Sequence, residues 1–431
     1  MRFSLLFVFL VLFPSTSHAQ LHVKAIIAHV GDVYLRVGNR SIDKMEDVEC
    51  TIERYDGEWA WIHTGDGKEG WVKRTDIVPL DRAIDHLTQK IREQPRQPML
   101  YQVRALVWTR QGEADLALRD LTEAIVLNPT DAALYNTRGN IYVDKDQYDR
   151  ALDNFNQAIR LRPTDSFYWH NAGLARLYKG DVDKAIENFT KAVELNPRLP
   201  AAWVGRGQAR ERNGQYDRAI ADFSEAIRVD PKHATGFLNR ADALRYMHQS
   251  EKALADYNVA LRTWPAKSSL WCKAGDCRAE LGQFDKAIAN YNEAIRLSPD
   301  RSAYFYYRGQ SWKQKRDYGR ALADFSKAIQ LDSKDPYSYN ARAWLLATCP
   351  DAQYRDGEQA VQTASRACEL TDWKTWNWID TLAASYAEAD DFDNAVKYQK
   401  RALGLLPAGD PNRGELSERL ELFEAGKPFR E

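Results

Sequence analysis

The histidines and cysteines, the side chains best suited to chemistry, are few and scattered in this 431-residue sequence. There are eight histidines and five cysteines, and none of them has the spacing of a zinc site. The sequence also lacks the glycine-rich phosphate-binding loop of nucleotide-binding proteins and the G-x-S-x-G turn of serine hydrolases. The pattern therefore predicts no catalytic residues, no metal site and no cofactor, and it argues against an enzyme.

The five cysteines are predicted to be buried free thiols. Cys272 and Cys277 lie about 140° apart around one predicted helix, which puts them beyond disulfide distance. Cys349 ends one helix and Cys368 lies near the end of the next, antiparallel helix, which leaves roughly 15 Å between them. A disulfide between Cys349 and Cys368 would form only if the turn between their helices folds back.

Arginines and acidic or amide residues recur sixteen residues apart. The arginines are Arg104, Arg138, Arg206, Arg240, Arg308 and Arg342, with Ala172 and Ala274 at two equivalent positions. For the first seven of these eight positions, the residues that follow at this spacing are Asp120, Asn154, Asn188, Asp222, Asp256, Asn290 and Asp324. Every Asp has an Arg, and both alanines have an Asn. We therefore predict internal salt bridges, because an unpaired buried charge costs on the order of 3–5 kcal/mol. Arg138 opposite Asn154 does not follow this rule.

A longer period organises these positions. Prolines recur every 34 residues, at Pro129, Pro163, Pro197, Pro231, Pro265 and Pro299. The text between them is also repeated: YDRALDNFNQAIRLRP at residues 148–163 corresponds to YDRAIADFSEAIRVDP at residues 216–231. Such a period indicates stacked helix pairs, because one pair cannot bury its apolar face alone. Small residues such as Gly139 and Gly207 mark the close approach of two helices, and proline ends the second helix.

This pattern resembles the tetratricopeptide repeat, a 34-residue helix–turn–helix unit. The resemblance implies a mainly α fold, a right-handed tetratricopeptide α-solenoid. Nine units are expected, at residues 98–131, 132–165, 166–199, 200–233, 234–267, 268–301, 302–335, 336–375 and 376–407. The eighth unit has extra residues between Cys349 and Gly357, so its turn should bulge. We expect a connecting and capping helix at residues 81–97 and a capping helix at 408–431.

The resemblance also implies protein or peptide partners, which this family holds on the inner face of its first helices. By inner face we mean positions 2, 5, 9, 12 and 13 of each unit. The candidate groove residues are Asn136, Asn140, Phe167, His170, Tyr178, Tyr246, Tyr306 and Trp344. Other polar residues at inner positions are Asp242, Arg245, Asp276, Glu280 and Gln310. Amides there would clamp an extended peptide backbone while the aromatic rings flank it.

Residues 22–80 consist of short alternating runs separated by Gly and Asp, which predict β-strands and tight turns. Asp56-Gly57 predicts a hairpin. Glu69-Gly70-Trp71-Val72 and the Ile77-Val78-Pro79 run resemble the last strands of bacterial SH3-like domains, which implies a small SH3-like β-barrel.

Trp59 and Trp61 alternate with smaller residues, so one face of their strand is aromatic. Related SH3-like modules bind peptides or cell-wall fragments through such rings, so cell-wall material is one candidate ligand of this face. The alternative, which we favour, is that the rings close the small barrel or pack on the first helix.

Residues 1–19 have the pattern of a secretory signal peptide. Arg2 precedes an apolar run of eleven residues, Phe3–Phe13, and small residues Ser17 and Ala19 predict cleavage before Gln20. The run is too short for a permanent membrane anchor, and no later segment is apolar for long enough. We expect export to the periplasm or the outside of the cell, with an uncleaved N-terminal tether as the alternative.

A formal net charge of −1 removes the simple electrostatic case for binding nucleic acid or an anionic membrane. The sequence therefore favours an exported, non-catalytic scaffold that binds other proteins. The alternative is a cell-wall-targeted accessory protein of an envelope enzyme, in which the barrel reads cell-wall material and the repeats dock the enzyme.

Overall fold

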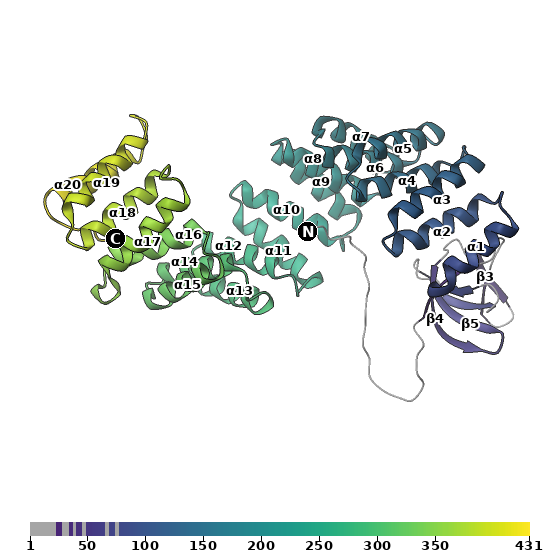
Figure 1. Cartoon of the computed structure of the whole chain (residues 1–431), viewed down its shortest axis with the longest axis horizontal. Helices are drawn as coiled ribbons and strands as arrows, with labels where there is room; N and C mark the ends of the chain where they lie inside the picture. Colours follow the sequence, from purple (N-terminus) through teal and green to yellow (C-terminus); the bar gives the residue numbers. More distant parts are fainter. Residues whose placement is uncertain (1–22, 28–33, 38–39, 45–48, 65–68, 74–76) are drawn as a thin grey trace. The chain divides into compact units, whose positions relative to one another are not determined.

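The computed structural model describes residues 23–27, 34–37, 40–44, 49–64, 69–73 and 77–431. The predicted signal peptide at residues 1–19 lies outside these ranges. The chain divides into two compact units, Met1–Pro197 and Arg198–Glu431 (Figure 1).

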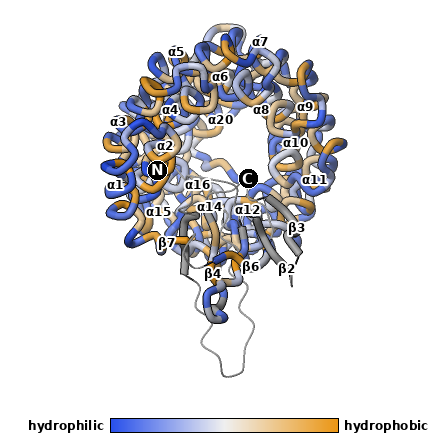
Figure 2. Tube along the Cα trace, turned by 90° about the vertical axis from the view of Figure 1, so that its right-hand side faces the viewer, coloured by the Kyte–Doolittle hydropathy of each residue, from blue (hydrophilic) through white to orange (hydrophobic). Residues whose placement is uncertain are grey.

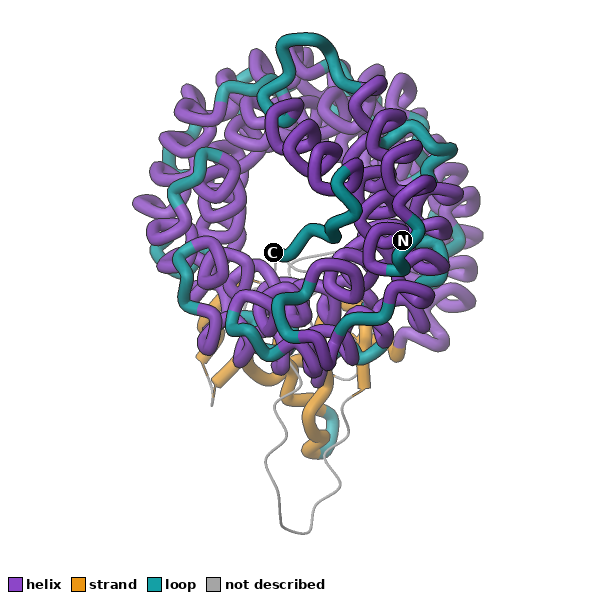
Figure 3. Tube along the Cα trace, turned by 90° about the vertical axis from the view of Figure 1, so that its left-hand side faces the viewer, coloured by secondary structure: helices purple, strands orange, loops and turns teal. Residues whose placement is uncertain are grey.

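The described strands, orange in Figure 3, all belong to the first unit. They are β1 (Val23–Ile27), β2 (Tyr34–Val37), β3 (Arg40–Lys44), β4 (Glu49–Asp56), β5 (Trp59–Thr64), β6 (Glu69–Lys73) and β7 (Ile77–Pro79). All neighbouring strands are antiparallel, in the order β3-β2-β6-β5-β4-β1-β7. The predicted strands are therefore present as a small N-terminal sheet, and the SH3-like barrel stays a prediction.

A two-residue turn joins β4 and β5, as the Asp56-Gly57 dipeptide predicts. Asp56 pairs with Trp59, and Gly57 has a φ of +56°, which is a conformation that glycine adopts without strain. Alternate residues of the sheet face a core that contains Ile52, Ala60 and Ile62, all fully buried.

The first unit continues with the short helix η2, the single helix α1 and three helix pairs. Its helices are η2 (Leu80–Arg82), α1 (Ala83–Glu93), α2 (Pro98–Arg110), α3 (Ala114–Leu127), α4 (Ala132–Asp144), α5 (Tyr148–Leu161), α6 (Ser166–Lys179) and α7 (Val182–Leu195). Helix α1 buries Leu87 and Ile91 against Leu100 and Val103 of α2. It therefore takes the place of a second helix before the first pair.

The second unit is helical throughout. Its helices are α8 (Pro200–Arg212), α9 (Tyr216–Val229), α10 (Ala234–Tyr246), α11 (Ser250–Thr263), α12 (Ser268–Glu280), α13 (Phe284–Leu297), α14 (Ser302–Gln314), α15 (Tyr318–Leu331), α16 (Pro336–Thr348), η3 (Ala352–Tyr354), α17 (Gly357–Leu370), α18 (Trp376–Glu388), α19 (Phe392–Leu405) and α20 (Arg413–Glu424). Each first helix begins at the residue expected to start a repeat. The short helix η3 occupies the predicted bulge of the eighth repeat.

Local sequence explains where the helices begin and end. Each proline of the 34-residue ladder lies two residues beyond the end of a second helix, since proline cannot continue it. Several first helices start after an aspartate whose carboxylate accepts a free backbone N–H; Asp131 and Asp165 are examples. The tubes in Figure 2 change between hydrophilic and hydrophobic along the helices, as expected for helices that bury one side.

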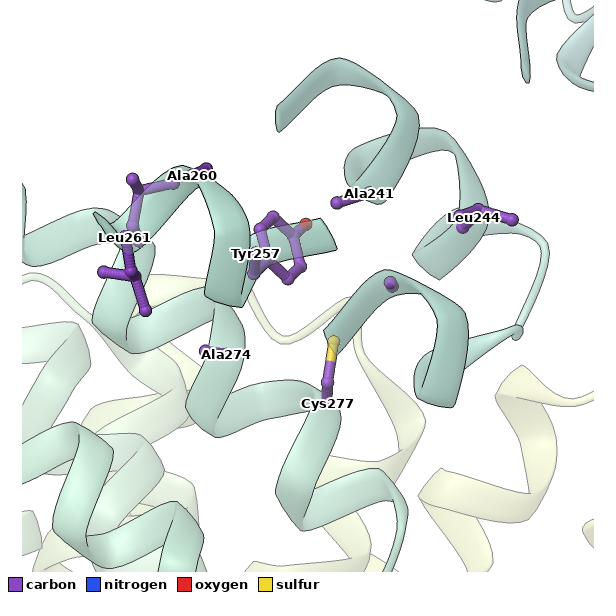
Figure 4. Close-up of a cluster of buried hydrophobic side chains, with 9 residues drawn as sticks. Ala241, Leu244, Tyr257, Ala260, Leu261, Ala274 and Cys277 are labelled. Carbon is purple, nitrogen blue, oxygen red and sulfur yellow. The ribbon is translucent and has the colours of Figure 1, made fainter. Parts of the chain in front are cut away.

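Glycine allows the two helices of a pair to approach closely. A Cβ atom added at Gly139 or Gly207 would lie only 2.6 or 2.5 Å from the Cε1 atom of Phe155 or Phe223, respectively. These aromatic rings are fully buried. The core also runs from one pair into the next: Figure 4 shows Tyr257 of α11 between α10 and α12, near Cys277.

The predicted salt bridges between first and second helices are confirmed. Arg240 donates to both carboxylate oxygens of Asp256 at 2.7 and 2.8 Å, and the same bidentate pairs join Arg104 to Asp120, Arg206 to Asp222 and Arg308 to Asp324. The remaining guanidinium nitrogen of Arg240 donates to Ser224 of the preceding pair at 3.0 Å. One arginine therefore connects three helices.

Arg138, the exception in the sequence, uses neutral partners. Its Nε donates to the Asn154 side-chain oxygen at 2.8 Å, and its Nη1 donates to Thr122 at 3.2 Å. All five cysteines are buried, and none of them forms a disulfide, as predicted.

Candidate partner-binding groove

Charged and aromatic side chains gather on three consecutive first helices of the second unit, α10, α12 and α14. They surround a cleft of about 500 Å³. Its lining includes Arg245 of α10, Asp276 and Glu280 of α12, and Tyr307 and Gln310 of α14. Four of these five residues, all except Tyr307, occupy inner positions, so the 34-residue period brings them to one side.

Asp276 is the most buried charge of the cleft. Tyr291 donates a hydrogen bond to its Oδ1 at 2.9 Å, and Arg245 lies 3.6 Å from its Oδ2. Burial raises the pKa of Asp276 to about 6, because desolvation outweighs the hydrogen bond and the nearby guanidinium. The carboxylate is therefore charged at neutral pH and becomes protonated in mild acid.

A second carboxylate, Asp242, lies on α10. It accepts a hydrogen bond from Tyr257 at 2.5 Å and two from the Lys273 ammonium at 2.6 and 2.7 Å. Glu211, at the end of α8, has a raised pKa because of burial and the nearby Asp242 charge.

We call Glu211, Asp242, Arg245, Lys273, Asp276 and Glu280 the acidic cluster. It holds four acids and two bases. A ligand that carries a positive charge would therefore be favoured there.

The two tyrosines that donate hydrogen bonds to these aspartates were not predicted, although the sequence contains a pattern that indicates them. Among the first seven repeats, only the fifth and sixth have Tyr at position 24, namely Tyr257 and Tyr291, and only these have Asp at position 9. Each tyrosine reaches the aspartate of its own repeat. The coincidence of the two residue types at fixed spacing could have predicted the contact.

Exposed rings border the cleft and its neighbourhood. Tyr307 is 39% exposed and packs face to face with Tyr291, with 6.1 Å between the ring centroids. The candidate Tyr306 is partly buried, and its hydroxyl accepts a hydrogen bond from Gln310 at 3.1 Å. The candidate Tyr246 is 63% exposed and stacks on Tyr216 at 4.0 Å. Tyr307, which lies outside the predicted inner positions, lines the cleft together with Phe284 and Tyr291 of α13.

Trp344 of α16 is also on the inner face, but it is covered by this chain. Phe429 lies 5.8 Å from its ring centroid, and the Arg419 guanidinium lies 5.7 Å from it.

The candidates in the first unit lie on the first helices α4 and α6. Asn136 accepts a hydrogen bond from Asn171 at 2.8 Å, and Asn140 is exposed. Phe167, 54% exposed, lines a separate cleft of about 630 Å³, formed by the ends of α5 and α7, the turn after α5 and the start of α6. Tyr178 is 52% exposed and lies 6.1 Å from the Tyr148 ring.

His170 is mostly enclosed, and its ring lies 5.5 Å from Phe189. Burial lowers the pKa of His170 to about 4, so its ring is neutral at physiological pH. This residue contributes packing to the first unit.

The aromatic face of the N-terminal sheet lies opposite its core. Trp59 and Trp61 are partly exposed, whereas Ala60 and Ile62 between and beside them are buried. The Trp61 ring makes an edge contact with Trp71 at 5.3 Å.

Within the described residues, no group of three or more His, Cys, Asp or Glu side chains is arranged to hold a metal ion. None of the helices in this part of the chain combines the length and the apolar character needed to cross a membrane.

The helix pairs and their shared core define the class: an α-helical repeat protein. Two tetratricopeptide repeat family profiles match the chain, one at residues 170–235, 238–302 and 272–336, the other at residues 132–165. The chain therefore contains tetratricopeptide repeats. No curated protein matched it.

Several solved structures are similar to parts of the chain. One is YrrB, titled a TPR protein with an unusual peptide-binding site, at 27% identity, 42% of this chain, 92% of that chain and a TM-score of 0.35. Another is MamA from Desulfovibrio magneticus, at 20% identity, 39% of this chain, 96% of that chain and a TM-score of 0.38. Yeast Tom70 is 15% identical over 80% of this chain and 92% of its own, with a TM-score of 0.40.

Proposed function

We propose that this chain is a non-catalytic scaffold that binds extended segments of partner proteins on the inner face of its repeats. The observation that carries the proposal is the cleft on α10, α12 and α14, where carboxylates and a partly exposed tyrosine surround about 500 Å³. Stacked helical repeats commonly use such a surface to bind peptides.

The partner segment carries a lysine or arginine that enters this cleft. Asp276 and Glu280 supply two negative charges, and Arg245 offsets only one of them. A guanidinium or ammonium group can pair with a carboxylate and at the same time lie over the Tyr307 ring. An acidic segment would meet repulsion at the same place.

A peptide array tests this proposal. The probes are random 12-residue peptides, and the protein is the chain from Gln20 to Glu431. We expect bound peptides to be enriched in Lys and Arg, and Asp276→Asn with Glu280→Gln to weaken their binding about tenfold. The matched control is Glu293→Gln, since this glutamate pairs with Arg296 on the second helix α13. Bound peptides without basic enrichment, or equal binding by the cleft variant, would contradict the proposal.

The acidic cleft also sets a pH dependence for binding. Because burial raises the pKa of Asp276 to about 6, its carboxylate loses charge as the pH falls through that value. Affinity for a basic peptide should therefore be highest above pH 7 and fall between pH 7 and 5. Fluorescence anisotropy of the best array peptide across this range measures the effect, and Asp276→Asn should flatten it.

A second candidate function rests on the sheet face that carries Trp59 and Trp61. Partly exposed aromatic rings on a small sheet can stack on the apolar faces of sugars or peptides, so this face would read cell-wall material while the repeats dock an envelope enzyme. Sedimentation with purified cell-wall sacculi tests it. Retention that survives Trp59→Ala and Trp61→Ala would exclude this use of the face.

The proposed place of action is the periplasm or the outside of the cell. This part rests on the signal-peptide pattern of residues 1–19. Mass spectrometry of the protein from fractionated cells tests it, and a mature chain that begins at Gln20 outside the cytoplasm is the expected result.

A further inference from the structure

The last residues of the sequence return to the inner face after the capping helix has ended. Helix α20 stops at Glu424, and Gly426, with a φ of +66°, turns the chain back. Lys427–Glu431, which we call the closing segment, then runs beside α16 and α18 as an irregular loop. Figure 3 shows this loop between the end of the helix and the point marked C.

The closing segment contacts three first helices through different chemistry. The Phe429 ring packs on Trp344 of α16 at 5.8 Å. Arg430 pairs with Glu388 of α18 at 2.5 Å, and Glu431 pairs with Lys313 of α14 at 2.8 Å.

A backbone contact completes this arrangement. The backbone N–H of Glu431 donates to the carbonyl oxygen of Thr348 at 3.0 Å, where α16 ends. A helix end offers such carbonyl groups because its last turn lacks intrahelical partners. Arg430 Nη1 also donates to the Ala347 carbonyl oxygen at 3.4 Å, and the Arg419 guanidinium lies 5.4 Å from the Phe429 ring centroid. The segment is therefore held by aromatic and cation–π contacts, ion pairs and hydrogen bonds to main-chain carbonyls, the kinds of interaction that a bound peptide would make.

The Glu388 carboxylate under the segment is oriented to bind a guanidinium group. Glu388 is only 12% exposed and lies in the last turn of its helix. Its other carboxylate oxygen, Oε1, accepts a hydrogen bond from Arg355 Nε at 2.9 Å, which fixes the orientation of the side chain. Trp344 of α16 contacts the ring of Phe429, the residue that precedes Arg430.

The segment is held loosely in comparison with the cap that precedes it. Leu416 and Phe423 of α20 are fully buried, whereas Phe429 and Arg430 stay partly exposed, and Lys427 and Glu431 are exposed. The closing segment is therefore less buried than the capping helix that precedes it. Partly exposed ion pairs contribute little to stability.

We propose that the inner face of α16 and α18 is a binding surface for a partner segment with an aromatic residue followed by arginine, and that the closing segment occupies this surface as a competing internal ligand. The proposal rests on the peptide-binding role of the inner face but concerns a surface distinct from the acidic cluster. Lys313 of α14 anchors the segment on the helix that also carries Gln310 and Gln314 of the cleft, so a longer partner could reach both surfaces.

A labelled peptide tests the proposal on the full chain. The probe is fluorescein-AGKPFRE, the sequence of residues 425–431, and its scrambled control is fluorescein-AGRPEKF. We expect Phe429→Ala with Arg430→Ala to bind the probe at least tenfold more tightly than the unaltered chain, because its own segment no longer competes. Adding Glu388→Gln to this variant should remove the gain. Lys427→Ala is the matched control and should behave as the unaltered chain.

Circular dichroism and urea unfolding of each variant separate binding from folding. Arg430→Ala alone keeps the Phe429 contact and should bind the probe about threefold more tightly than the unaltered chain. If folded variants bind no probe, or bind the scrambled peptide equally, the segment is only a structural seal and the proposal is wrong. Asp276→Asn with Glu280→Gln should leave probe binding unchanged, so failure of the acidic cleft and failure of this surface give different results.

Discussion

At the residue scale, the distance between paired helices depends on single hydrogen-for-methyl differences. Gly207 lies against the ring of Phe223, and a Cβ there would lie 2.5 Å from a ring carbon. In the fifth repeat, Ala241 and Tyr257 occupy the positions of Gly207 and Phe223 (Figure 4). A residue larger than glycine therefore occurs at this position, together with a different residue opposite it.

Gly207→Ala should therefore destabilise the second unit. Alanine favours a helix over glycine by about 1 kcal/mol, but overpacking in a filled core costs about 1–3 kcal/mol, and the second effect should be larger. The control is Gly404→Ala in α19, where nothing lies within 4 Å of the added Cβ atom and a small gain in stability is expected. Urea unfolding measures both, and a more stable Gly207→Ala protein would contradict the packing argument.

His170 should make the stability of the first unit depend on pH. Its pKa is about 4 in the fold and near 6.5 in the unfolded chain, so the unfolded state binds the proton more tightly. The neutral His170 therefore contributes fully to the stability of the fold above pH 6.5. As the pH falls toward 4, up to about 3 kcal/mol of this stability is lost. Urea unfolding between pH 4.5 and 7.5 gives the unfolding free energy at each pH. This free energy should change less with pH in His170→Gln than in the unaltered chain. The exposed His248→Asn serves as control, and an unchanged pH dependence for the His170 variant would contradict the assignment.

At the element scale, partly buried arginines connect consecutive helices. Arg240 of α10 binds Asp256 of α11 and Ser224 of α9. Arg104 contacts Thr88 of α1, sixteen residues before it, as Arg240 contacts Ser224 sixteen residues before it. Helix α1 therefore acts as the second helix of an incomplete repeat. Arg138, Arg240 and Arg308 therefore each couple a repeat to the one before it.

Asp256→Ala should cost about 3 kcal/mol, the lower end of the range for a broken buried pair, because it leaves the partly buried Arg240 charge without its carboxylate. Asp256→Asn should cost less, since Asn154 already accepts a hydrogen bond from Arg138 at 2.8 Å in the second repeat. Urea unfolding of the two variants gives the comparison. Equal destabilisation by both variants would show that an amide cannot replace the Asp256 carboxylate. The Arg138–Asn154 pair of the second repeat would then depend on other features of that repeat.

At the scale of the whole molecule, the five buried thiols report on unfolding. Cys50 lies in the small core of the N-terminal sheet, whereas Cys277 lies in a core shared by three helices. Burial raises the pKa of Cys277 and of Cys368 to about 12, so neither forms a reactive thiolate in the fold.

All five thiols should therefore resist a disulfide reagent in the native protein. In increasing urea, Cys50 should react first, because local stability follows the size of the core that protects a residue. Mass spectrometry after pulse labelling identifies the modified cysteine at each urea concentration. Reaction of Cys277 before Cys50 would reverse the expected order.

The sequence alone determined the repeat. The 34-residue period predicts where each helix pair starts, because capping, proline termination and helical spacing act within a few residues. The Arg–Asp pairs were also readable, since both residues belong to one repeat at constant spacing, as Arg206 and Asp222 do.

Only the tertiary structure decided what the inner face contains. Tyr307 lines the cleft while Tyr306 turns into the core, because the exact rotation of α14 depends on packing with its neighbours. The contact between Trp344 and Phe429 joins residues far apart in sequence. No local pattern encodes it, since it exists only after the last repeats have stacked and the capping helix has turned the chain back.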